Sequence, residues 1–106
     1  MSHLTTHILD GSAGTPAAEV EVTLLDAAGG AVACGRTDAD GRLALGPDRL
    51  PPGTYALVFQ TGAYFAARDT ATFYPSVRVT FAVADAEHYH VPLLLSPFAY
   101  STYRGS

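Results

Sequence analysis

The chain has 106 residues, of which 48% are hydrophobic and only 15% are charged, and its formal net charge is -4. This length allows one hydrophobic core, so we expect a single domain over residues 1–106. The cationic residues are all arginine and are scattered, which excludes the basic stripe that nucleic-acid binding needs. The low charge indicates that part of the surface is buried in an oligomer.

Membrane spans and secretion signals are also missing from the pattern. No apolar run approaches the roughly 18 residues of a membrane span, and the first residues lead directly into a strand pattern without a signal-peptide h-region. The single cysteine, Cys34, cannot close an internal disulfide and is most simply a small strand residue. We therefore expect a cytoplasmic protein that binds neither nucleic acid nor membranes.

Alternation of apolar and polar residues dominates the chain, with the period of two that is typical of half-buried strands. In chain order it predicts strands at residues 3–10, 19–26, 31–37, 42–45, 54–60, 76–83, 88–95 and 98–104. Turn residues separate these strands, for example at Asp10-Gly11, Gly29-Gly30 and Asp40-Gly41. We expect an all-β fold, an antiparallel β-sandwich of about eight strands.

One segment breaks the alternation. Residues 62–70 are rich in alanine, and Tyr64, Phe65 and Arg68 stand at helical spacing. Pro75 follows and ends the segment. We expect one short helix here.

The strand predicted at residues 88–95 carries two histidines away from the core. Its apolar face consists of every second residue, namely Tyr89, Val91, Leu93 and Leu95. His88 and His90 therefore project from the opposite face. Pro92 has no N–H to donate to a ladder, which suggests an edge strand or a local bulge.

The first strand places a further histidine outside the core. Leu4, Thr6 and Ile8 share one face, and the other face carries His3, Thr5, His7 and Leu9. Arg42 follows the Asp40-Gly41 turn, where it is either a solvated residue or a rigid fork of donors held at a strand end. Spacing alone leaves both interpretations open.

The commoner hydrolase and nucleotide-binding motifs are absent, including Gly-x-Ser-x-Gly, Cys-x-x-Cys, His-Glu-x-x-His and a glycine-rich phosphate loop. The imidazoles, one guanidinium and the hydroxyls of the final residues remain. Such groups can activate a water, hold an oxyanion and protonate a leaving nitrogen, which suits metal-free hydrolysis of an amide or lactam.

Several segments together carry a family resemblance. They are Leu4-Thr-Thr-His-Ile-Leu-Asp10 with Gly14-Thr-Pro-Ala17, Thr37-Asp-Ala-Asp-Gly-Arg42, Tyr64-Phe65, Phe73-Tyr-Pro75, His88-Tyr-His-Val-Pro-Leu-Leu-Leu-Ser-Pro97 and Tyr103-Arg-Gly-Ser106. They resemble the 5-hydroxyisourate hydrolase family, the transthyretin-like enzymes of urate breakdown. The terminal Tyr-Arg-Gly-Ser separates these hydrolases from transthyretin, the hormone carrier of the same fold. The chain departs from the family pattern at Asp38, where asparagine is usual.

The resemblance implies a homotetrameric transthyretin-like sandwich with active sites in clefts between dimers. The implied reaction is hydrolysis of the lactam of 5-hydroxyisourate to 2-oxo-4-hydroxy-4-carboxy-5-ureidoimidazoline, in purine catabolism, with no metal and no other cofactor. The implied catalytic residues are His7, Arg42, His90 and Ser106, and Tyr103 joins His7, Arg42 and Ser106 in contacting substrate. Which histidine is the general base stays open.

Two other functions also fit part of the pattern. A zinc hydrolase could use His7, His88 and His90 as three imidazole ligands. A transthyretin-like carrier would hold a small apolar ligand in a channel between subunits. The polar terminus argues against the carrier.

Overall fold

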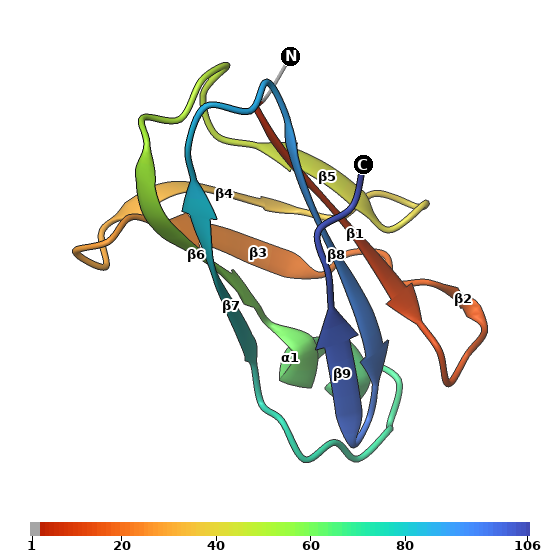
Figure 1. The fold of residues 1–106 in the computed structure, drawn as a ribbon. Helices are drawn as coiled ribbons and strands as arrows, with labels where there is room; N and C mark the ends of the chain where they lie inside the picture. Colours follow the sequence, from red (N-terminus) through yellow and green to blue (C-terminus); the bar gives the residue numbers. More distant parts are fainter. Residues whose placement is uncertain (1–2) are drawn as a thin grey trace.

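A computed structural model describes residues 3–106, and its strands form two sheets packed face to face (Figure 1). The five-stranded sheet contains β1 (Leu4–Asp10), β2 (Thr15–Pro16), β5 (Arg42–Leu45), β8 (Tyr89–Ser96) and β9 (Ala99–Thr102), in the order β2-β1-β8-β9 with β5 also paired to β1. The four-stranded sheet contains β3 (Glu21–Leu25), β4 (Ala31–Arg36), β6 (Gly53–Phe59) and β7 (Val77–Val83), in the order β4-β3-β6-β7. The predicted all-β sandwich is confirmed.

The core lies between the sheets and follows the predicted alternation. In β1, Leu4, Thr6 and Ile8 are buried, whereas Thr5 and His7 are half-buried on the other face. The largest fully buried side chains include Phe59 of β6 and Phe65 of the helix. Each such burial contributes about 1.5–3 kcal/mol relative to exposure, so these side chains fix which face of each strand points outward.

The helix α1 (Thr61–Ala66) connects β6 to β7 and is shorter than predicted. Asp69 takes a positive φ of 51°, which is incompatible with continued right-handed helix. No helix in residues 3–106 is long and apolar enough to cross a membrane.

Two features of the sheets differ from the prediction. The two-residue strand β2, which pairs with the end of β1, was not predicted because so short a segment carries no alternation. The pairing of β1 with β8 is parallel, whereas the other strand pairs are antiparallel. Most of the chain separates these two strands, so no hairpin fixes their relative direction.

The suggestion that Pro92 marks an edge strand is wrong, because β8 lies between β1 and β9. The hydrogen-bonded ladder between β8 and β9 ends where Leu93 faces Thr102. The C-terminal tail, residues 103–106, continues alongside β8 in the same register and pairs with it once more, through an isolated bridge between His90 and Gly105. Since Gly105 N–H donates to the His90 carbonyl, His90 and, by alternation, Pro92 turn their backbones toward this tail. Because Pro92 has no N–H to donate, the hydrogen bonding between β8 and the tail is interrupted opposite Tyr103.

A buried carboxylate ties the turn after β1 to the helix. Asp10 is 2% exposed, and one of its oxygens accepts hydrogen bonds from Ser12 and Ala13 while the other accepts from the Tyr64 hydroxyl at 2.7 Å. Burial raises the pKa of Asp10, but these hydrogen bonds outweigh it and leave the pKa below its ordinary value of 3.8. Burial, together with the Asp10 hydrogen bond and charge, raises the pKa of Tyr64 to about 12.

The Tyr64→Phe variant is expected to lose about 1.5–3 kcal/mol of unfolding free energy at pH 7, because a buried charged acceptor loses its donor. The folded-state pKa of Asp10 is below 3.8, so the stabilisation by its charge is complete above that pH and disappears as the pH falls through the lowered value. The difference between wild type and variant should therefore shrink in acid. Urea titrations from pH 7 to pH 2.5 measure it.

Tyr55→Phe is the matched control, because the buried Tyr55 hydroxyl donates to the neutral Pro51 carbonyl at 2.7 Å. Its loss of about 0.5–1.5 kcal/mol should not change with pH over that range. If the loss of unfolding free energy in Tyr64→Phe is as independent of pH as the loss in Tyr55→Phe, the role given to the Asp10 charge is contradicted.

Candidate functional site

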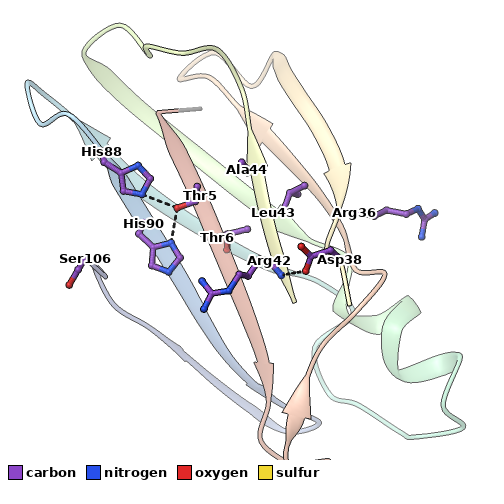
Figure 2. A pocket seen from close by; sticks show the side chains of 10 residues that line it. All are labelled: Thr5, Thr6, Arg36, Asp38, Arg42, Leu43, Ala44, His88, His90 and Ser106. Carbon is purple, nitrogen blue, oxygen red and sulfur yellow. Dashed lines mark hydrogen bonds between the residues drawn. The ribbon is translucent and has the colours of Figure 1, made fainter. Parts of the chain in front are cut away.

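Four polar residues singled out in the sequence meet on the outer face of the five-stranded sheet (Figure 2), namely Arg42, His88, His90 and Ser106. An open hollow of about 510 Å³ lies over β5, β1 and β8. Its polar lining includes Thr5, Asp38, Arg42, His88, His90 and Ser106. One imidazole pair, the guanidinium groups of Arg36 and Arg42 and several hydroxyls thus line a single surface.

Strand register explains why these groups come together. Thr5 of β1 lies opposite His90 of β8 in the parallel pair, and His7 of β1 lies opposite Arg42 of β5 in the antiparallel pair. Residues opposite one another on paired strands share a face. His7 and His90 are both half-buried on this outer face, as the alternation predicted.

A fixed turn presents Arg42. One carboxylate oxygen of Asp38 accepts hydrogen bonds from the backbone N–H groups of Asp40 at 2.9 Å and Arg42 at 3.0 Å. Gly41 has a φ of 74°, and a Cβ there would clash with the Ile8 carbonyl. An asparagine amide oxygen could accept the same two bonds as Asp38, so the departure at this position keeps the turn and adds a negative charge.

His7 is oriented by the same turn. Its Nε2 lies 2.9 Å from the carbonyl oxygen of Asp40. A carbonyl oxygen can only accept, so Nε2 carries the hydrogen and the neutral ring keeps its lone pair on Nδ1.

His90 is held by a hydroxyl that it shares with a second histidine. Its Nδ1 lies 2.8 Å from Oγ1 of Thr5, and the same oxygen lies 3.0 Å from Nε2 of His88. Burial lowers the pKa of His90, and the repulsion that a protonated His90 would meet from His88, Arg42 and His7 lowers it further, while the Thr5 hydrogen bond opposes the shift. His90 is therefore neutral at pH 7.

The C-terminal tail completes the hollow. Gly105 lies against the His90 ring so closely that a Cβ at this position would stand 2.5 Å from Cδ2 of His90. Ser106 then reaches the hollow beside His90. Tyr103 is 57% exposed and lines a neighbouring cavity of about 310 Å³, which shares His90 with the hollow.

The structure therefore brings Arg42, His90 and Ser106 to one hollow and places His7 beside Arg42. Tyr103 lines the neighbouring cavity and not this hollow. The sequence did not single out Thr5 as a site residue. The sequence feature that could have identified Thr5 is its position two residues before His7, which puts both side chains on the same face of β1.

The zinc alternative needs His7, His88 and His90 to converge. Within residues 3–106, no group of three or more histidine, cysteine, aspartate or glutamate side chains is placed to hold a metal ion. This ligand set is not assembled within one chain.

The two-sheet topology and the polar hollow on its outer face define a transthyretin-like protein. The chain belongs to the HIUase/Transthyretin family, whose model matches residues 4–105.

Individual relatives agree with this assignment. The chain is 48% identical to the 5-hydroxyisourate hydrolase of Salmonella dublin over 109 residues, covering 97% of this chain and 80% of the relative. Among solved structures, it is similar to Klebsiella pneumoniae 5-hydroxyisourate hydrolase, with a TM-score of 0.92, 41% identity and coverage of 100% and 94% of the two chains. Transthyretin from Sparus aurata gives a TM-score of 0.90 with 34% identity and coverage of 99% and 97%.

The Gly105→Ala variant is expected to displace the His90 ring, because the added methyl group has no space beside Cδ2. The ring resonances of His90 in a ¹H–¹³C spectrum should shift, while the melting temperature changes little. Gly11→Ala is the control, because its Cβ would meet the Leu95 carbonyl at an ordinary 3.6 Å. Unmoved His90 resonances in Gly105→Ala would show that the tail does not hold the ring.

Proposed function

We propose that this protein hydrolyses 5-hydroxyisourate to 2-oxo-4-hydroxy-4-carboxy-5-ureidoimidazoline in urate breakdown. The observation that carries this proposal is the convergence of Arg42, His90 and Ser106 on one hollow in a chain whose relatives are 5-hydroxyisourate hydrolases. The reaction is a lactam hydrolysis, which needs a base for water, a donor for the oxyanion and a proton for the leaving nitrogen.

His90 is our candidate for the base. Its lowered pKa keeps the ring neutral at pH 7, so it can take a proton from the water that attacks the lactam carbonyl. Arg42 then holds the oxyanion through its planar donors. Ser106 or His7 delivers a proton to the leaving ring nitrogen, and the reaction proceeds by water attack without a metal or other cofactor.

A direct assay tests the function. Urate oxidase generates 5-hydroxyisourate from urate in the cuvette, and the ultraviolet absorbance of this product decays faster when the protein is present. Decay curves that are identical with and without the protein would remove the proposal. Saturable binding of a small apolar ligand without turnover would instead support the carrier function.

Single replacement of His7, His90 or Arg42 is expected to lower kcat by about a hundredfold or more, as for loss of an acid–base or oxyanion group. Arg42→Lys should also be poor, because lysine offers a point charge in place of the planar fork. Circular dichroism confirms that each variant is folded, and Arg78→Lys on the exposed part of β7 is the control. Near-normal turnover by Arg42→Lys contradicts the assigned role.

The pH dependence follows from the neutral base. The folded-state pKa of His90 is below its ordinary 6.5. The ratio kcat/KM, which reports ionisations of the free enzyme, should therefore be flat from pH 8 to about pH 6.5 and should fall as the pH drops through the lowered pKa. Initial rates, corrected for spontaneous decay at each pH, measure this limb. An acid limb centred above pH 6.5 would rule out His90 as the base.

We also propose a homotetramer, with the hollow closed by a second copy. Leu9, Leu94 and Tyr100 are 36%, 41% and 41% exposed and border a second hollow of about 330 Å³ over β1, β8 and β9. Such exposed apolar side chains support a partner surface. Closing the site would exclude water and strengthen the interaction of Arg42 with developing charge.

Light scattering alongside the hydrolysis assay tests the assembly. Leu94→Arg should split the tetramer into smaller species and lower activity, although Leu94 does not line the catalytic hollow. A fully active monomer at assay concentration would contradict the closed site.

The proposed location is the cytoplasm. Cys34 is exposed and free, which suits a reducing compartment.

A further inference from the structure

We propose that Thr5 is a positioning residue that links His90 to His88, so that the proton taken from water by His90 leaves the site through the Thr5 hydroxyl and the exposed His88 ring. This inference rests on the proposed function of the same site. It gives Thr5 and His88 tasks in that reaction.

Lactam hydrolysis at neutral pH creates a need for such a path. Water adds to the carbonyl carbon, the C–N bond breaks, and the nitrogen gains one hydrogen. The new carboxylic acid, with an ordinary pKa of about 4, then ionises. One proton per turnover must therefore leave a site whose base is half-buried.

The geometry supplies a continuous chain of hydrogen bonds. Oγ1 of Thr5 lies 2.8 Å from Nδ1 of His90 and 3.0 Å from Nε2 of His88. The two rings are nearly parallel, with an interplanar angle of 16° and centroids 6.4 Å apart. Figure 2 shows the Thr5 hydroxyl joined to both rings, of which His88 is exposed and His90 is half-buried.

A hydroxyl has one hydrogen, so it donates to one ring and accepts from the other. If Thr5 donates to Nε2 of His88, it accepts from Nδ1–H of His90, and Nε2 of His90 keeps its lone pair. In the reverse arrangement Nε2 of His90 carries the hydrogen and cannot act as a base. The hydroxyl thus couples the tautomers of the two histidines.

The proton transfer balances without any further reactant. Nε2 of His90 takes a proton from water, and the resulting hydroxide forms the C–O bond. Nδ1–H of His90 passes its proton to Oγ1 of Thr5, whose own hydrogen moves to Nε2 of His88. His88 then releases one proton to solvent from Nδ1. The transfer leaves the hydrogen of both rings on Nε2, and each ring returns to its Nδ1–H tautomer by proton exchange with solvent before the next turnover.

The surrounding charges favour outward transfer. His88, Arg42 and His7 each disfavour a positive charge on His90, and two further arginines, Arg36 and Arg104, line the cavities that His90 borders. The carboxylate of Asp38 lies in the same hollow, but one of its oxygens is engaged by two backbone N–H groups of the turn. His88 is exposed, so a positive charge there is solvated.

The first test uses no substrate. In ¹H–¹⁵N spectra that report imidazole tautomers, His88 and His90 of the wild-type protein should titrate as a coupled pair, with each ring's tautomer responding to the other. Thr5→Val keeps the branched shape but removes the hydroxyl, and it should uncouple the two titrations. Thr5→Ser should retain the coupling, and Thr54→Val, at an exposed position of β6, should leave the spectra unchanged.

The second test measures proton export. Thr5→Val should lower kcat by about tenfold to a hundredfold with little change in KM, since a step after binding is affected. His88→Ala should show a similar loss that rising concentrations of imidazole buffer restore. A purely structural role of Thr5 or His88 would not respond to buffer concentration.

The outcomes separate this inference from the function on which it rests. Coupled titration in wild type, lost only in Thr5→Val, together with buffer rescue of His88→Ala, supports the relay. Independent titration of the two rings in wild type overturns it, and so does a His88→Ala loss that imidazole does not restore. Absence of turnover by the wild-type protein removes the proposed function, while the spectra still decide whether Thr5 couples the rings.

Discussion

The backbone ladder between β1 and β8 determines where the polar groups of the hollow lie. Because these strands are parallel and in register from Leu4 opposite Tyr89 to Asp10 opposite Leu95, Thr5 stands beside His90. The antiparallel pairing of β1 with β5 then adds Arg42 beside His7. A shift of one residue in either ladder would turn these side chains toward the core. The apolar residues between the sheets therefore maintain the site without lying in it.

The tail depends on this ladder in a second way. Pro92 interrupts the pairing of β8 with the tail, and Thr102 donates through its hydroxyl to the Pro92 carbonyl at 2.7 Å. Beyond this point Arg104 lies over the Tyr89 ring, with its guanidinium carbon 4.8 Å from the ring centre. The tail thus leaves the sheet and rejoins it beside His90, which lets backbone pairing deliver Ser106 to the hollow.

Much of this was predictable from the sequence because alternation has a strict physical cause. The parity of β1 and β8 assigned His7 and His90 to the outer face, and the Asp40-Gly41 turn located the start of β5. Alternation along a strand does not reveal the direction of the strand or which strand it pairs with. The parallel ladder and the pairing of Thr5 with His90 could therefore not be predicted from it.

His3 shows a second limit, because it shares the parity of His7 but is 2% exposed. It precedes β1, where the Leu50 N–H and the Ala86 carbonyl enclose its ring through hydrogen bonds to both nitrogens. These contacts come from loops that are distant in the sequence, so no local sequence pattern predicts them.

The carboxylate at position 38 has a consequence for the ageing of the protein. Asparagine in a turn loses ammonia slowly, and such a loss would place a new negative charge close to Arg42 in an increasing fraction of molecules. Asp38 already carries that charge and makes both turn hydrogen bonds. Deamidation therefore cannot change the charge at position 38 during storage.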